Sequence, residues 1–211
     1  MSILTIVIGM LGTNICRSAT ASINSYIEKS NLPDVIYTTK LLSTSKNEEL
    51  ISIDGVKTIN NRFVTSGNFE VEQDGIFSGY FISYDSKDLN AITYFEEAKV
   101  DKNAIESYIP YAFAKRHNIK AGENLILYVK GVKIETVIKA IISSPETLFG
   151  DKDFMSAHEG YSYTNLYVNK DDICKLLNAS NLSNQWLFYF EDGVNDSQIN
   201  QIKSQIKEVF T

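Results

Sequence analysis

The sequence predicts an α+β protein of two lobes, in which a βαβ–βαβ sheet is interrupted by a mostly β insert. Residues 34–72 and 163–211 both alternate β-rich runs with short helical patterns, whereas the segment between them is dominated by β-formers and hairpin signals. The 211 residues carry a net charge of −6, with 44% hydrophobic and 22% charged residues. These values are ordinary for a globular protein, and the negative charge argues against nucleic-acid binding.

The opening of the chain is its most apolar part. Ile3 to Ile15 contains no charged side chain, but a membrane-spanning helix requires about 20 such residues. No basic residue precedes the run, so a secretory signal is not indicated. Two interpretations stay open on these residues alone: a buried core segment, or the end of a longer transmembrane helix. An amphipathic helix is predicted over 12–30, ending before Pro33.

The first section of the chain is predicted to be β-α-β. Asp34 to Lys40 is rich in β-formers and predicts a strand. Thr44 to Ile53 predicts a short helix, for which Gly55 is a suitable C-cap. Residues 56–72 predict one long or broken strand.

The middle section has the signals of hairpins. Asp74-Gly75 lies between two β-rich runs and predicts a tight turn. A helix is predicted within 104–118, starting at Pro110, because proline is well tolerated in a first turn. A turn at 120–123 and a second hairpin over 124–142, through Lys130-Gly131, complete this section.

The last section returns to the first pattern. Strands are predicted over 163–168 and 185–190, with a short helix over 171–178 between them. A final helix is predicted over 195–210, since Ile199, Ile202, Ile206 and Val209 form an apolar stripe at helical spacing.

The sequence lacks the residue constellations of an enzyme. It contains no phosphate loop, no dinucleotide-binding fingerprint and no G-x-S-x-G elbow. His117 and His158 are the only histidines, so a multi-histidine zinc site cannot be built. Asp151-Lys152-Asp153 begins like a calcium loop but lacks the glycine and the final glutamate. We therefore expect no catalytic residue, no metal site and no cofactor.

An aromatic run after the first hairpin is the candidate partner or substrate surface. Alternation along a strand places Phe77 and Phe81 on one face and Tyr80 and Tyr84 on the other. Aromatic burial statistics favour core packing for most of these side chains. The second face is the candidate for contact with a partner or a lipid.

Two stretches resemble the extracytoplasmic domain of FtsX-like ABC-transporter permeases of the MacB type. The family pattern is a helix ending in A…N-I-K-x-G-D, two strands, and then G-I-v-x-S-P-E. The matching residues are Ala114, Asn118, Ile119, Lys120, Gly122, Ser144, Pro145 and Glu146. Glu123 and Ala140 replace the usual Asp and Gly. Near the start, the family's N-L-x-D-V/I stretch and a later G-V are matched by Asn31, Leu32, Asp34, Val35, Gly55 and Val56.

The resemblance implies a domain organisation. Residues 1–30 would be the end of transmembrane helix 1 and the stalk helix that leaves it. Residues 31–72 and 162–211 would form a porter-like βαβ lobe, and residues 73–161 a sabre-like β-rich insert. The apolar run Ile3–Ile15 and the Ile-striped final helix would be the stubs of the two flanking membrane helices.

The resemblance also implies a function. The domain would lie on the extracytoplasmic side of the cell membrane, where it would couple ATP-driven movement of the transmembrane helices to an extracellular substrate or protein, without catalysis. Its partners would be the transmembrane helices of its own permease and, indirectly, a cognate ATP-binding subunit. The alternative is a membrane-anchored or secreted module that binds a ligand or protein through its aromatic surface.

Overall fold

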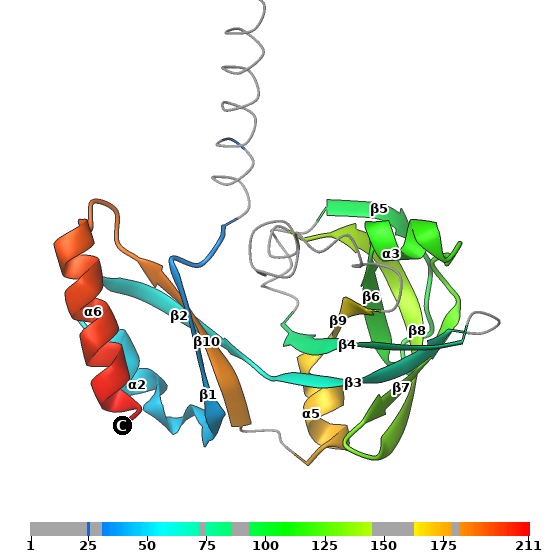
Figure 1. Cartoon of the computed structure of the whole chain (residues 1–211), viewed down its shortest axis with the longest axis horizontal. Coiled ribbons are helices and arrows are strands. Elements are labelled where there is room, and N and C mark those ends of the chain that lie inside the picture. Colours follow the sequence, from blue (N-terminus) through cyan, green and yellow to red (C-terminus); the bar gives the residue numbers. More distant parts are fainter. Residues whose placement is uncertain (1–24, 26–30, 72–74, 86–92, 145–162, 179–181) are drawn as a thin grey trace, which may run out of the picture.

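The computed structural model describes residues 25, 31–71, 75–85, 93–144, 163–178 and 182–211 (Figure 1). The run Ile3–Ile15, Cys16, the carboxylates Asp151 and Asp153, and His158 lie outside these residues. None of the helices in the described ranges is long and apolar enough to cross a membrane. Within these ranges the strands form two separate sheets.

The smaller sheet is built from the two ends of the described chain. Its strands β1 (Val35–Ser43), β10 (Leu182–Phe190) and β2 (Val56–Arg62) are antiparallel and lie in that order. The 3₁₀ turn η1 (Thr44–Lys46) and helix α2 (Asn47–Ile51) connect β1 to β2, and helix α6 (Asp196–Val209) follows β10. Figure 1 shows α2 and α6 on the same face of this sheet. The sequence predicted each of these elements.

Helix α6 covers the core of the smaller sheet. Its apolar stripe packs against the sheet, and Ile202 and Ile206 are buried there with Trp186 and Phe188. The helix begins with a reciprocal capping box, in which Asn195 and Gln198 bond each other's backbone N–H groups. The stripe is therefore a core face, and its interpretation as the stub of a membrane helix is wrong. An apolar stripe at this spacing is common to both kinds of helix, and only the packing separates them.

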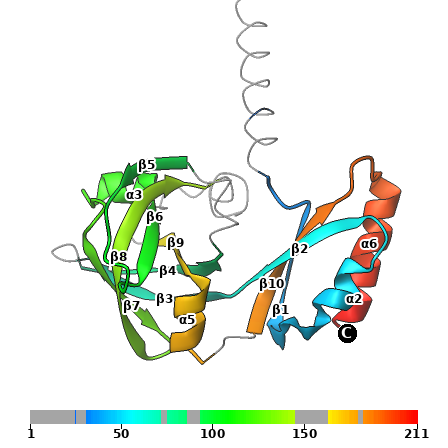
Figure 2. The ribbon, with the colours of Figure 1, turned by 180° about the vertical axis from the view of Figure 1, so that it is seen from behind.

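The larger sheet closes into a barrel. Its strands are β3 (Val64–Val71), β4 (Gly75–Tyr84), β5 (Thr93–Glu97), β6 (Glu106–Pro110), β7 (Asn124–Val129), β8 (Val132–Ser143) and β9 (Tyr163–Asn169). The order is β5-β8-β6-β9-β4-β3-β7, and the long strand β8 also pairs with β7. This second pairing joins the two sides of the sheet, as the views in Figures 1 and 2 show. Strand β5 stays outside the closed ring, because it pairs with β8 alone.

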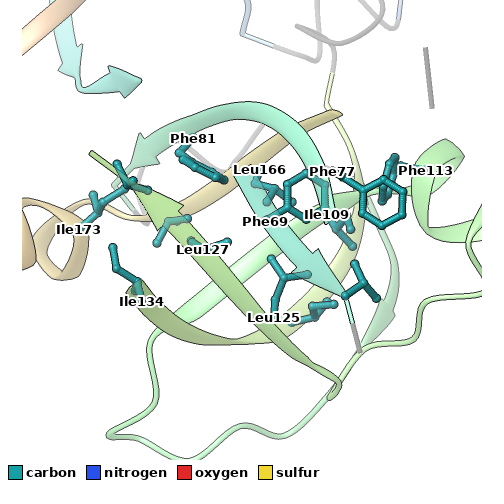
Figure 3. Packing of buried hydrophobic residues seen from close by; sticks show 14 of the residues in the cluster. Phe69, Phe77, Phe81, Ile109, Phe113, Leu125, Leu127, Ile134, Leu166 and Ile173 are labelled. Carbon is teal, nitrogen blue, oxygen red and sulfur yellow. The ribbon is translucent and has the colours of Figure 1, made fainter. Parts of the chain in front are cut away.

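Apolar side chains from every strand of the ring fill the barrel (Figure 3). Among them, Phe69, Phe81, Leu125, Leu127, Ile109 and Ile138 are fully buried. Helices α3 (Tyr111–Arg116) and α5 (Lys170–Leu176) add Phe113 and Ile173 to the same cluster. The predicted turn Lys130-Gly131 is present, with φ values of 48° and 82°, as a tight hairpin with two left-handed residues requires.

The boundary between the two sheets differs from the predicted one. The sequence assigned 56–72 and 162–178 to the same sheet as the first and last strands, but β3, β9 and α5 belong to the barrel. Strand β9 is buried on both faces, since Leu166 lies in the barrel core and Tyr167 in a cluster outside it. Along its edges β9 pairs in parallel with β4 and antiparallel with β6, which places it inside the larger sheet. Whether the two sheets are separate folding units stays a prediction.

Strands β5 and β6 were not predicted. The region around Pro110 was interpreted as a helix, and the structure places α3 directly after that proline, as expected. The residues before it, Glu106 to Pro110, instead form β6 in parallel pairing with β8. The run is too short for its periodicity to separate a strand from a helix.

Candidate functional site: the junction between the two sheets

The described chain passes between the two sheets at two places. One crossing runs from β2 through Phe63 into β3, and the other leads from α5 to β10. Phe63 is only 2% exposed and its ring packs in the barrel core. Its backbone is also held by the barrel, because Phe63 N donates to Ser83 Oγ at 2.7 Å and Ser83 N donates to Phe63 O at 2.8 Å. The barrel thus anchors the chain at the point where it leaves the smaller sheet.

Two side chains connect the sheets beside this crossing. Asn184 of β10 accepts a hydrogen bond from Val64 N at 2.8 Å and donates one to Val64 O at 2.7 Å. Lys170, the first residue of α5, donates from Nζ to Asn61 O at 2.7 Å and to Asn61 Oδ1 at 2.8 Å. Asn184 thus extends from the smaller sheet to the barrel, and Lys170 from the barrel to the smaller sheet. We call these two residues and their partners Asn61 and Val64 the junction clamp.

The junction clamp joins the two sheets through hydrogen bonds on both sides of Phe63. The clamp contains no nucleophile paired with a base. Among the described residues, no group of three His, Cys, Asp or Glu side chains is placed to hold a metal ion. Burial raises the pKa of the Cys174 thiol, which disfavours the reactive thiolate.

A polar cavity lies away from the junction, beside the start of α6. Its volume is about 850 Å³. Its lining includes the carboxylates of Asp54, Glu191 and Asp192 and the amides of Gln198 and Gln201. All five side chains are exposed, so the cavity is an open hollow of the surface.

The aromatic residues selected from the sequence divide between core and surface. Phe77 and Phe81 point into the barrel and are 8% and 0% exposed. Tyr84 lies on the other face of β4, as alternation predicted, but is 5% exposed in a second cluster. Tyr80 is 42% exposed and is the one member of the four on the surface. Three of the four residues therefore do not form the predicted partner surface, because both faces of β4 are covered over much of its length.

A different pair of aromatic rings is exposed on the barrel. Phe95 of β5 and Tyr111 of α3 stack with their ring centroids 4.4 Å apart, and they are 54% and 40% exposed. Lys115 Nζ lies 5.6 Å from the centre of the Tyr111 ring. The pairing of β5 with β8 shifts register between Tyr94 and Glu96, so Phe95 is the extra residue of a bulge, a feature that redirects side chains. Sequence analysis missed this pair because a bulge and a contact between distant segments leave no periodic signal.

Tyrosine hydroxyls form a chain on the outer face of the barrel. The rings of Tyr84 and Tyr108 meet edge to face, 4.8 Å apart, and Tyr108 OH donates to Glu106 Oε2 at 3.3 Å. Burial raises the pKa of Tyr108 to about 12. Burial, and then a hydrogen bond to Tyr108, raises the pKa of Tyr84. Both hydroxyls are therefore held in the protonated form.

We expect alkaline pH to destabilise the fold through these tyrosines. Because their pKa values are higher in the folded than in the unfolded chain, their contribution is complete below pH 10 and is lost as the pH rises. The free energy of unfolding should fall by about 1–2 kcal/mol between pH 10 and pH 12. Urea unfolding followed by circular dichroism at several pH values measures this fall. It should be smaller in Tyr84→Phe, and an equal fall in that variant would contradict the assignment.

No protein-family model matches this chain, and no curated protein matches it.

Solved structures similar to this chain include an extracellular domain, a periplasmic region and a domain of a putative permease. The extracellular domain of the noncanonic ABC-type transporter YknZ from Gram-positive bacteria is 14% identical, with a TM-score of 0.49 over 82% of this chain and 88% of that chain. The periplasmic region of MacB from Actinobacillus actinomycetemcomitans is 12% identical, with a TM-score of 0.49 over 80% and 74%. A domain of a putative permease protein from Porphyromonas gingivalis is 10% identical, with a TM-score of 0.48 over 81% and 72%.

Proposed function

We propose that this chain is the extracytoplasmic domain of a permease subunit of an FtsX-like ABC transporter. In this role the domain is non-catalytic and lies outside the membrane. It couples the ATP-driven movement of transmembrane helices to an extracellular substrate or protein. The ATPase is a separate domain or subunit.

One observation carries the proposal: the two ends of the described chain form one sheet, and the barrel is inserted between them. A movement applied to β1 passes to β10 through their pairing and then to β2. From β2 and β10 it reaches the barrel through the junction clamp and Phe63. The architecture therefore provides a mechanical path from one end of the chain to an outer lobe.

The residues that resemble the permease family have structural roles that support this proposal. Ala114 is buried in the barrel core, and Asn118 ends α3 with a φ of 53°. Ile119 N then donates to Ala114 O at 2.9 Å, which is the bond of a Schellman cap. Gly122 has a φ of 94° and its N–H donates to Ile138 O. These residues thus build the corner between α3 and β7.

The proposal predicts the membrane topology of the complete protein. The reading frame that contains this chain should encode four or more apolar spans of about 20 residues, three of them after Thr211. A cysteine introduced by Lys203→Cys on the exposed face of α6 should react with a membrane-impermeant maleimide in intact cells. Cells that express the unsubstituted protein are the control. A frame that closes near Thr211, or labelling only after lysis, would contradict the proposal.

A second candidate function is a membrane-anchored or secreted binding module. The exposed stack of Phe95 and Tyr111 favours it, because exposed aromatic side chains are enriched where proteins bind partners. The same experiment separates the two functions: extracytoplasmic labelling in a frame with no further spans after Thr211 would favour the binding module.

A further inference from the structure

We propose that the side-chain amide of Asn184, assisted by Lys170, sets the orientation of the barrel relative to the smaller sheet. The two sheets would then move as one body while the junction clamp is intact, and would turn about Phe63 when it is broken. This inference concerns the fold and does not depend on the proposed function.

The amide of Asn184 stands in for a missing part of the strand ladder. Strand β10 pairs with β2 up to Gln185 and Arg62, so a continued ladder would bring Phe63 and then Val64 against β10. Instead, the backbone of Phe63 turns to Ser83 of the barrel. The N–H and C=O of Val64 are bonded by the Asn184 side chain in place of a peptide group. The chain thereby passes from the smaller sheet into the barrel. The backbone of Val64 still keeps a hydrogen-bond partner, Asn184, on the smaller sheet.

The chemistry of this contact is specific to a carboxamide. Val64 offers one donor and one acceptor, and an amide side chain supplies the complementary acceptor and donor. An aspartate of the same shape would keep the bond from Val64 N but place a second oxygen against Val64 O. A leucine would fill the space and make neither bond.

Lys170 is placed for the junction and not for its own helix. A positive charge at the first residue of a helix opposes the helix dipole, and Asp171 and Asp172 in the same turn follow the usual preference. Asn169 already caps α5 by accepting from the N–H groups of Asp171 and Asp172. The two bonds from Lys170 Nζ instead bind Asn61, at the end of β2.

Hydrophobic packing does not supply the same connection. Among the described residues, one apolar cluster belongs to the smaller sheet with its helices, and the other two belong to the barrel and the crossing residues Phe63 and Val64. None of these clusters joins β1, β2 or β10 to the barrel strands, whereas the crossings and the polar clamp do. Removing the clamp should free the angle between the sheets without opening either core.

The test is a distance measurement between spin labels on the two sheets in the full chain. The labels are attached at Lys203→Cys on α6 and Glu135→Cys on β8, both exposed positions, with Cys16 and Cys174 replaced by alanine. The parent chain should give one narrow distance distribution. Asn184→Leu and Lys170→Met should each broaden it, and the double variant should broaden it most. The width of the distribution in Asn184→Asp should lie between that of the parent and that of Asn184→Leu.

Gln185→Glu is the matched control. Like Asn184→Asp, it changes an amide to an acid, one residue along β10. The hydrogen bonds of Gln185 to Arg62 and Thr38, however, stay within the smaller sheet. Its distance distribution should match that of the parent. Hydrogen exchange gives a second readout, in which protection of the Val64 amide should fall about tenfold in Asn184→Leu, as expected for the loss of one or two net hydrogen bonds.

A narrow, parent-like distribution in the double variant would overturn the proposal, and so would equal broadening in Gln185→Glu. If Asn184→Leu does not fold, Asn184→Asp and Lys170→Met decide the question, since they keep the shape or the stem of the native side chain. Parent-like distributions in both would also overturn it.

Discussion

Replacing Gly79 by alanine should destabilise the chain by about 3 kcal/mol or more. Gly79 lies on β4 and faces Gly67 on β3. A Cβ at Gly79 would lie 2.1 Å from the backbone oxygen of Thr164 on β9. No side-chain rotation can relieve this contact, because both positions are backbone. Either the two strands separate or the barrel loses its tight curvature.

Urea unfolding at neutral pH measures the Gly79→Ala effect. Ser78→Ala is the control, since it changes the adjacent, exposed residue and removes one surface hydrogen bond to Asn68. We expect that control to cost about 1 kcal/mol or less. A Gly79→Ala variant that unfolds at the same urea concentration as the control would show that the barrel does not need this close approach.

Replacing Trp186 by alanine should remove about 3–5 kcal/mol from the stability of the smaller sheet. The side chain is fully buried between the sheet and its helices, and its ring lies 4.7 Å from that of Phe210. Its core shares no member with the barrel core. The loss should therefore be local, with faster amide hydrogen exchange in β1, β2 and β10 and little change in the barrel strands β6 to β8.

Hydrogen exchange with mass spectrometry separates local from global unfolding in this variant. Trp186→Phe is the control, because it keeps an aromatic ring and loses the bond from Trp186 Nε1 to Asn47 Oδ1. Trp186→Phe should lower the free energy of unfolding by less than half as much as Trp186→Ala does. Equal acceleration of exchange in both sheets of Trp186→Ala would show one cooperative unit, and the proposed division into two lobes would then be wrong.

The elements that local signals define were predictable. The apolar stripe predicted α6, whose start the capping box at Asn195 stabilises, and the Asn169 side chain caps α5. The left-handed pair Lys130-Gly131 specified the turn between β7 and β8. Alternation along β4 correctly separated Phe77 and Phe81 from Tyr80 and Tyr84. Each of these signals acts over a few residues and needs no distant partner.

The candidate site was not predictable in the same way. Asn184 and Lys170 are ordinary polar residues in the sequence, and they become the junction clamp because β10 and α5 meet β2 and β3 in space. Alternation placed Tyr84 on the face of β4 that points away from the barrel core, but a second cluster outside the barrel buries it. The stack of Phe95 on Tyr111 depends on a bulge. All of these depend on contacts between segments that are far apart in the chain.

The sequence by itself determined the α+β class, most of the helices and hairpins, the apolar stripe of α6 and the absence of the enzyme motifs sought. It also carried the motif at Asn118 to Gly122, whose backbone conformation is a local property of asparagine and glycine. Only the tertiary structure decided which sheet each strand joins. A strand can pair with any of several segments that are distant in the sequence. Here the chain leaves the smaller sheet at Phe63, because burial of Phe63 in the barrel core outweighs further pairing of β2 with β10. The physical reason is that hydrophobic burial is non-local, whereas caps and turns are local.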